Sequence, residues 1–289
     1  MPGFEELTIR LPDGYKAHAR WWQAEPSHGA ALYLHGIQSH CGWYGESARR
    51  LVEAGISVLQ PDRRGSGRNP ADRGHAESAG QLVDDAFACL DLLTERSGCE
   101  KCHLIGVSWG GKLATVMHVT RPERTATLSL VTPGLFPVVG VSRTEMLRIG
   151  FSMASAPRRS FDIPLNDPAL FTAMPERVAY LRSDALQIHQ ATAGFYLASR
   201  RLDKPASKLR NAVEVPLHLM LAGDERIIDN ERTRAFVREL NWGGTLITTY
   251  GRSRHTLEFE PDREVFFADL AGWMGDPRSH VEHVGCESA

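Results

Sequence analysis

Short runs of apolar residues alternate with longer amphipathic stretches along most of the chain. Each run has the length of a strand and is apolar at nearly every position, which is typical of strands buried on both faces of a sheet. The stretch 79–98 has apolar residues at helical spacing, at Leu82, Ala86, Leu90 and Leu93. This alternation predicts an α/β protein with a mostly parallel central sheet and helices on both faces. The runs are "AALYLHG", "ISVLQPD", "KCHLIGVS", "TLSLVTP", "VPLHLMLAG" and "TLITTYG".

The N-terminal segment has a different pattern. Residues 4–23 alternate in polarity on either side of the turn sequence "LPDG", which is typical of a β-hairpin. We therefore expect antiparallel strands at one edge of the sheet.

Residues 134–210 also interrupt the alternation. They contain helix-like stretches but no convincing pair of strands, and we expect a largely helical cap inserted over the sheet edge. The predicted organisation is a first core segment at 1–133, this cap, a second core segment at 211–275 and a loose tail at 276–289. The prolines of the cap stand at positions 137, 157, 164, 168, 175 and 205.

The clearest candidate for chemistry is Ser108, in "GVSWGG" directly after an apolar run and before a helix-like stretch. The pattern G-x-S-x-G in that context predicts a nucleophile elbow, in which a strand turns sharply into a helix and the serine has strained backbone angles. Glycine is needed on both sides because side chains there would collide with the neighbouring strand and helix. The hydroxyl would then stand at the carboxyl edge of the sheet.

A serine hydroxyl needs a base to become nucleophilic, and the base needs an orienting carboxylate. On this pattern both follow the serine in the chain, first the acid and then the histidine. His255 follows the last predicted strand, so its loop can reach Ser108. Asp224 and Glu225 follow "PLHLMLAG", and because adjacent side chains face opposite ways only one of them can meet His255. We favour Glu225 and keep Asp224 as the alternative.

Hydrolysis through this serine also requires donors for the oxyanion. The backbone N–H of Trp109 follows the nucleophile, and the N–H of Ile37 lies in the loop after "ALYLHG". We expect these two groups to form the oxyanion hole, and we expect His35 to be structural, because the backbone does the chemistry.

Composition narrows the partners. The 289 residues carry 33 Lys plus Arg against 35 Asp plus Glu, so the net charge is −2, and we expect neither nucleic acid nor an anionic membrane as the main partner. No run of about 18 apolar residues and no secretory signal is present. Five scattered cysteines predict reduced thiols, and we expect packing roles for Cys99 and Cys102. These features together predict a cytoplasmic protein.

With these motifs the chain resembles the α/β-hydrolase superfamily, and within it the monoacylglycerol lipase and lysophospholipase branch, over about residues 4–275. The segment "LHGIQSHCGWY" is similar to the oxyanion segment H-G-x-x-x-H-x-x-x-Y of that branch, "PDRRGSGRN" to its D-x-x-G-x-G-x-S loop, and "HTLEFE" to the segment carrying its histidine. The resemblance also implies that "GDERIIDNERT" contains the acid, at Glu225, where the family usually has Asp. "GVSW" differs from the G-H-S-M of typical monoacylglycerol lipases.

The resemblance implies an α/β-hydrolase fold and hydrolysis of a small-molecule carboxylic ester, whose acyl chain would bind in an apolar pocket of the cap. No metal or organic cofactor is expected. A thioesterase, acyltransferase or amidase using the same triad is the alternative, followed by a hydrolase-like protein that binds a ligand without turnover. Seven cap residues are candidates for the acyl pocket, of which we expect two or three to contact substrate: Phe136, Phe151, Met153, Phe161, Leu165, Phe171 and Phe195.

Overall fold

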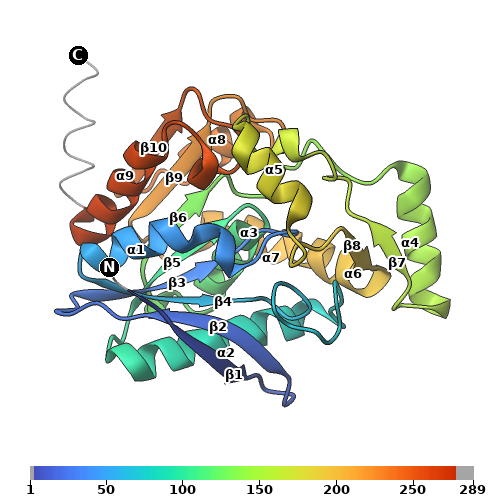
Figure 1. Ribbon diagram of the computed structural model, residues 1–289, viewed down its shortest axis with the longest axis horizontal. Helices are drawn as coiled ribbons and strands as arrows, with labels where there is room; N and C mark the ends of the chain where they lie inside the picture. The colour runs from blue at the N-terminus through green and yellow to red at the C-terminus, as the bar shows by residue number, and fades with distance from the viewer. Residues whose placement is uncertain (1–2, 278–289) are drawn as a thin grey trace.

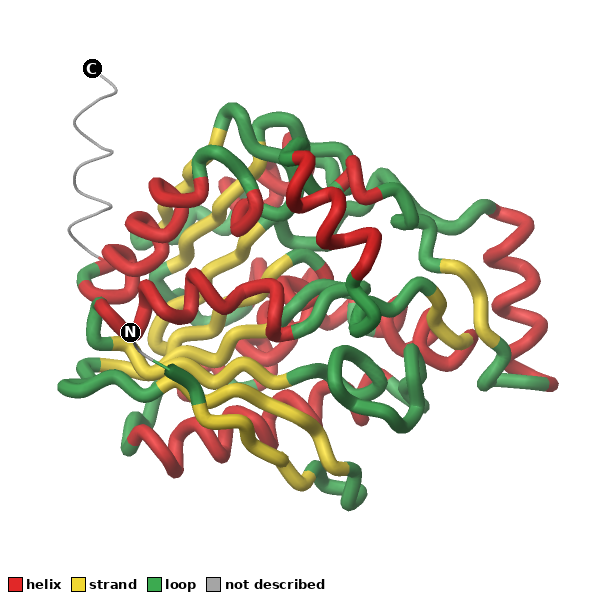
Figure 2. Tube along the Cα trace, viewed as in Figure 1, coloured by secondary structure: helices red, strands yellow, loops and turns green. Residues whose placement is uncertain are grey.

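The computed structural model describes residues 3–277, and its centre is an eight-stranded sheet with strand order β1-β2-β4-β3-β5-β6-β9-β10 (Figures 1 and 2). β1 (Glu5–Arg10) and β2 (Lys16–Trp22) form the predicted antiparallel hairpin at one edge. β2 also runs antiparallel to β4, and the remaining neighbouring strands of the sheet are parallel to each other. They are β3 (Gly29–Leu34), β4 (Ile56–Pro61), β5 (Cys102–Val107), β6 (Thr125–Val131), β9 (Leu217–Ala222) and β10 (Thr245–Tyr250).

Helices cover both faces of this sheet, which is why strands β3, β4, β5 and β9 are buried at every position. α1 (Gly45–Glu53) packs with α9 (Arg263–Gly275) on one face, and α2 (Ala79–Ser97) packs with α3 (Trp109–Thr120) on the other (Figure 1). α8 (Asn230–Arg238) connects β9 to β10. The mostly parallel α/β architecture predicted from the apolar runs is confirmed.

The chain between β6 and β9 contains the segment where the sequence predicts the cap. Its helices are α4 (Arg143–Ser155), α5 (Pro175–Ser183), α6 (Ala193–Arg201) and α7 (Asp203–Ser207). The expectation that this segment has no strand pair is wrong, because β7 (Ser160–Asp162) pairs antiparallel with β8 (Gln190–Thr192). Each strand is only three residues long, too short for an alternating pattern to stand out, and the pairing joins segments far apart in the sequence.

The cap is fastened to the core by a buried carboxylate. Asp184, just after α5, accepts hydrogen bonds from His40 Nε2 at 3.0 Å and from the indole N–H of Trp43 at 2.7 Å. Both partners belong to the loop between β3 and α1. The end of α5 is thereby held next to the segment that contains the predicted oxyanion donor.

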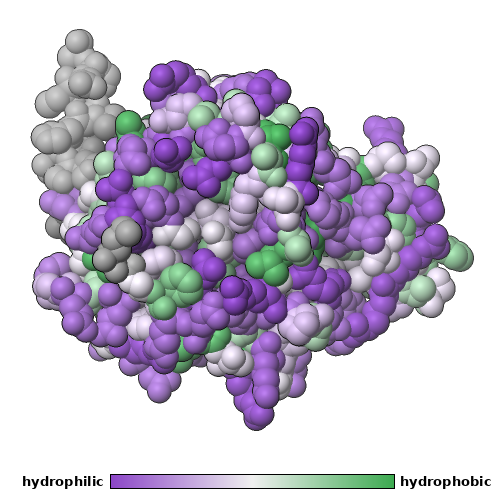
Figure 3. Space-filling view, viewed as in Figure 1, coloured by the Kyte–Doolittle hydropathy of each residue, from purple (hydrophilic) through white to green (hydrophobic). Residues whose placement is uncertain are grey.

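α4 stands apart from the core at the edge of the molecule (Figure 1). Leu147 is 76% and Phe151 77% exposed, and Figure 3 shows hydrophobic atoms at the surface over this helix on an otherwise mostly hydrophilic face. None of the described helices combines the length and apolar character needed to cross a membrane. Of the predicted tail, residues 278–289 lie outside the described part of the chain.

Candidate active site

Ser108 occupies the sharp turn between β5 and α3. Its backbone angles, φ 51° and ψ −118°, lie outside the ordinary regions for a side-chain-bearing residue. A Cβ on Gly106 would lie 2.5 Å from the Cα of Gly111, and one on Gly110 would lie 2.2 Å from the carbonyl oxygen of Leu34. The flanking glycines therefore permit the bend by close approach of strand and helix, as the sequence predicts.

Glu225 and His255 meet at the carboxyl ends of β9 and β10. His255 Nδ1 lies 2.9 Å from both carboxylate oxygens of Glu225, and each side chain is 2% exposed. Asp224 faces solvent instead, where it pairs with Arg226 at 2.9 Å and Arg254 at 3.0 Å. Of the two adjacent acids, the structure brings Glu225 to the histidine.

The Glu225 carboxylate is held in its charged form. Burial raises its pKa, but His255 and the backbone N–H groups of Ile227 and Ile228 outweigh that effect, so the pKa lies below its ordinary value. A charged acceptor on Nδ1 fixes the imidazole tautomer in which Nδ1 carries the proton and Nε2 is free to accept one.

Contacts from two segments hold the loop of His255. Its backbone carbonyl accepts a hydrogen bond from Thr132 Oγ1 at 3.0 Å, and the N–H of Thr256 donates to the carbonyl of Phe171 in the cap at 2.9 Å. The Phe171 ring also meets the imidazole edge to face, with centroids 6.1 Å apart. The cap and the end of β6 thus both orient the imidazole.

Within residues 3–277, Nε2 of His255 has no hydrogen-bond partner, and no hydrogen bond joins it to Ser108. In serine hydrolases without substrate the bond between base and nucleophile is often long and closes only in the substrate complex. The structure therefore joins the acid to the base and leaves the accepting nitrogen of the base available.

Ser108, Ile37 and Trp109 line one cavity of about 330 Å³. In the described part of the chain neither the backbone N–H of Ile37 nor that of Trp109 donates a hydrogen bond. The loop of Ile37 comes close to the serine, because a Cβ on Gly36 would lie 3.4 Å from the Cβ of Ser108. Two free N–H groups beside the serine can receive a negatively charged oxygen.

His35 supports this loop and does not face the cavity. Its Nδ1 contacts the carbonyl oxygen of Gly36 at 2.8 Å, and its Nε2 accepts the backbone N–H of Arg63 at 2.9 Å. Burial lowers its pKa to about 3, so the ring is neutral at ordinary pH. These contacts agree with the structural role expected from the sequence.

Leu165 is the one of the seven predicted cap residues that lines the Ser108 cavity. Phe151 faces solvent, Met153 lines a different cavity, and the remaining four are buried or half-buried in packing contacts. The other lining residues have no residue type in common that would mark them in the sequence. Lys112 has a positional signal, because it lies one helical turn after Ser108. The missed lining residues include Lys112, Val139, Val141, Met146, Ile163 and Tyr196.

Glu258, three residues after His255, is a buried carboxyl that accepts the N–H groups of Glu46 and Ser47 at the start of α1, each at 3.0 Å. Burial raises its pKa to about 7, from 4.5 in an unfolded chain. Between these two values the folded state holds a proton that the unfolded state releases, so this group's contribution to stability falls as pH rises from about 4.5 to 7.

Glu258→Gln keeps an oxygen acceptor for α1 and removes the titration. We expect it to raise the free energy of unfolding relative to the native chain by roughly 1–3 kcal/mol at pH 8, and by much less near pH 5. Urea unfolding of both proteins at the two pH values measures the difference. An equal effect at both pH values would contradict this assignment of the buried proton.

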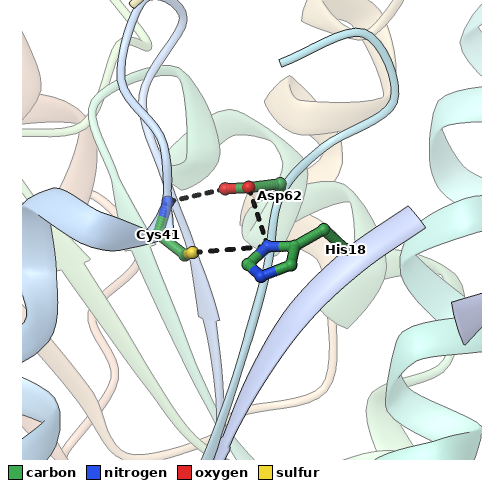
Figure 4. Close-up of side chains that lie close together, drawn as sticks. All are labelled: His18, Cys41 and Asp62. Carbon is green, nitrogen blue, oxygen red and sulfur yellow. Dashed lines mark hydrogen bonds and ion pairs between the residues drawn. The ribbon is translucent and has the colours of Figure 1, made fainter. Parts of the chain in front are cut away.

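Three potential metal ligands lie together beneath the loop after β3: His18, Cys41 and Asp62, with ligand atoms within 4.8 Å of one another (Figure 4). The carboxylate already accepts hydrogen bonds from His18 Nδ1 at 2.9 Å, the N–H of Cys41 at 2.8 Å and the N–H of Arg68 at 2.9 Å. Burial also raises the pKa of the Cys41 thiol. Because the carboxylate already accepts three hydrogen bonds and the thiol is protonated, we interpret this cluster as a junction that joins β2, the end of β4 and the loop.

Comparison with known proteins finds relatives of this chain in sequence and in structure. The model of the Hydrolase_4 family, described as "Serine aminopeptidase, S33", matches residues 25–262. A monoacylglycerol lipase of Mycolicibacterium smegmatis is 23% identical over 257 residues, which are 88% of this chain and 90% of that protein. The phospholipase YtpA of Bacillus subtilis is 23% identical over 85% of this chain and 95% of its own. The crystal structure of Paleococcus ferrophilus monoacylglycerol lipase superposes with a TM-score of 0.80 at 23% identity, covering 90% of this chain and 99% of that one.

Proposed function

This chain belongs to the serine aminopeptidase S33 family of hydrolases, and we propose that it cleaves carboxylic esters through an acyl-enzyme formed on Ser108. The observation that carries the proposal is the buried His255–Glu225 pair at the same sheet edge as the strained serine. The family match and the lipase relatives confirm the α/β-hydrolase resemblance and the ester hydrolase class predicted from the sequence.

In the proposed reaction, Ser108 Oγ attacks the ester carbonyl while His255 Nε2 takes its proton. Glu225 keeps the proton of Nδ1 in place and stabilises the imidazolium that forms. The N–H groups of Ile37 and Trp109 bind the oxygen that becomes negative. His255 then protonates the leaving alcohol. In the second half, His255 takes a proton from the water that attacks the acyl group, and it then gives that proton to Ser108 Oγ as the acid is released.

The cavity supports an ester with an apolar acyl chain. Most of its wall is apolar. The wall is formed by the start of the cap, by the segment from Ile163 to Leu165, and by Ile227 and Ile228 after the acid Glu225. Met146 extends this apolar wall to the exposed side of α4. Since relatives are named monoacylglycerol lipase and phospholipase, a monoacylglycerol, a lysophospholipid or a smaller carboxylic ester is the proposed substrate class. We propose that residues 134–210 act as the cap of this site.

Filling the cavity should change chain-length preference. Val141, a half-buried residue near the start of the cap, lines the cavity. Val141→Trp is expected to lower kcat/KM for p-nitrophenyl decanoate about 10-fold relative to p-nitrophenyl acetate. The matched control is Val265→Trp, at a 57% exposed valine of α9 that does not line the cavity. The test is a p-nitrophenyl ester series from acetyl to palmitoyl with all three proteins. An unchanged chain-length profile in Val141→Trp would reject this cavity as the acyl site, and an absence of cleavage of any ester would reject the proposed function.

The family description makes amide hydrolysis the second candidate. An aminopeptidase must bind the free ammonium group of its substrate, which calls for an available carboxylate. Among the described residues that line the cavity, the carboxylate is Asp203, and it forms an ion pair with Lys112. That pairing favours esters. Amino acid p-nitroanilides offered beside p-nitrophenyl esters decide between the two.

The proposed location is the cytoplasm. The cysteines within the described residues, Cys41, Cys89, Cys99 and Cys102, carry free thiols, which is typical of proteins in reducing compartments.

A further inference from the structure

The guanidinium of Arg63 lies between the two chain segments that supply the proposed oxyanion donors. Nη1 donates to the carbonyl oxygen of Gly36 at 3.0 Å, and Nη2 donates to that of Ile37 at 2.8 Å. On its other side, Cζ lies 4.7 Å from the centroid of the Trp109 ring. One side chain therefore contacts both donor-bearing segments.

Arg63 makes these contacts without a direct ion pair. Within the described residues no carboxylate oxygen lies within 4.0 Å of its guanidinium, whereas the adjacent Arg64 pairs with Asp85 at 2.8 Å and Asp13 at 2.9 Å. A half-buried guanidinium without a carboxylate is costly for the fold. Its hydrogen bonds are directed instead to two successive carbonyls of one loop.

The bond to Gly36 acts directly on the proposed donor. The carbonyl of Gly36 and the N–H of Ile37 belong to the same peptide unit, which is planar and trans. Holding the oxygen of that unit fixes the direction of the N–H at its other end. A cationic donor on the carbonyl also polarises the peptide, which makes the N–H a stronger donor.

We propose that Arg63 is a positioning residue that orients and polarises the Gly36–Ile37 peptide while packing against Trp109, so that the oxyanion hole is formed before substrate arrives. This inference rests on the proposed function. It makes Arg63 important for the transition state and of little importance for binding the uncharged ester, because the oxyanion exists only after attack.

The test compares Arg63→Met, which keeps the stem and removes the donors, with Arg63→Lys, which keeps the charge but cannot hold both carbonyls. With p-nitrophenyl butyrate, we expect Arg63→Met to lower kcat about 10- to 100-fold with KM changed less than about threefold, and Arg63→Lys to be intermediate. The inhibition constant of butylboronic acid, which forms a tetrahedral adduct on a serine hydroxyl, should rise by about the same factor as kcat/KM falls. Arg68→Met, a 46% exposed side chain on the same loop, is the matched control.

A purely structural Arg63 would give lower thermal stability with kcat of the folded enzyme and boronate affinity unchanged, and that result would overturn the inference. If Arg63→Met does not fold, Arg63→Lys decides by the same two readouts. If the native protein cleaves no ester, or if Ser108→Ala is as active as the native protein, the proposed function itself fails. An enzyme that depends on Ser108 but not on Arg63 refutes only this inference.

Discussion

Ser108→Ala is expected to lower kcat for p-nitrophenyl butyrate by about 10⁴- to 10⁶-fold, because the acyl-enzyme cannot form without the hydroxyl. The small remaining rate would come from the oxyanion donors and substrate binding alone. The substitution removes one oxygen from a half-buried residue, and the strained turn is maintained by Gly106 and Gly110, so the fold should persist.

Ser207→Ala, at an exposed serine of α7, is the control for this measurement. Circular dichroism and thermal unfolding establish that both variants are folded. A folded Ser108→Ala within tenfold of the native rate would show that the serine is not the nucleophile.

Glu225→Gln is expected to lower kcat by about 10³- to 10⁴-fold. The amide has nearly the same shape but no charge, so it neither stabilises the imidazolium of His255 nor holds the proton on Nδ1. The Ile227 N–H that now donates to the carboxylate at 2.8 Å can still donate to the amide oxygen, which should preserve the loop.

The adjacent acid provides the matched control. Asp224→Asn makes the same chemical change at a 48% exposed side chain, and we expect kcat within about threefold of the native value. Steady-state kinetics of the two variants side by side measures the contrast. If Asp224→Asn is the crippled variant, the role of the acid passes to Asp224.

The parts of this site that depend on local geometry could be predicted from the sequence. The sharp bend at Ser108 follows from the two glycines around it and from the mostly apolar strand before it, because a nucleophile elbow combines these features. The parallel sheet follows from strands that are apolar at most positions. Both features arise within a few residues, where short-range sterics dominate.

The choice between two neighbouring carboxylates depends on contacts distant in sequence. Alternation at a strand end says that one of Asp224 and Glu225 faces the histidine, but not which one. In the structure Arg254, 30 residues away, pairs with Asp224 at 3.0 Å on the exposed side and Glu225 takes the buried place. The family pattern supports the choice of Glu225, whereas alternation leaves Asp224 as the alternative.

The cap was the least predictable part. Its helices are short, and the side that meets the core depends on partners such as Asp184 and His40, which are 144 residues apart. Periodicity therefore did not separate the exposed Phe151 from the buried Phe171. Aromatic residues there mark packing as often as a ligand pocket.

The most direct test of Ser108 as the nucleophile is mass spectrometry of the protein after reaction with a fluorophosphonate, which modifies activated serine hydroxyls. We expect one phosphonyl group per chain on the peptide containing Ser108, with hydrolysis lost in proportion to labelling and no label on Ser108→Ala. Full esterase activity with Ser108 unmodified, or labelling of another residue in step with the loss of activity, would contradict the assignment of Ser108 as the nucleophile.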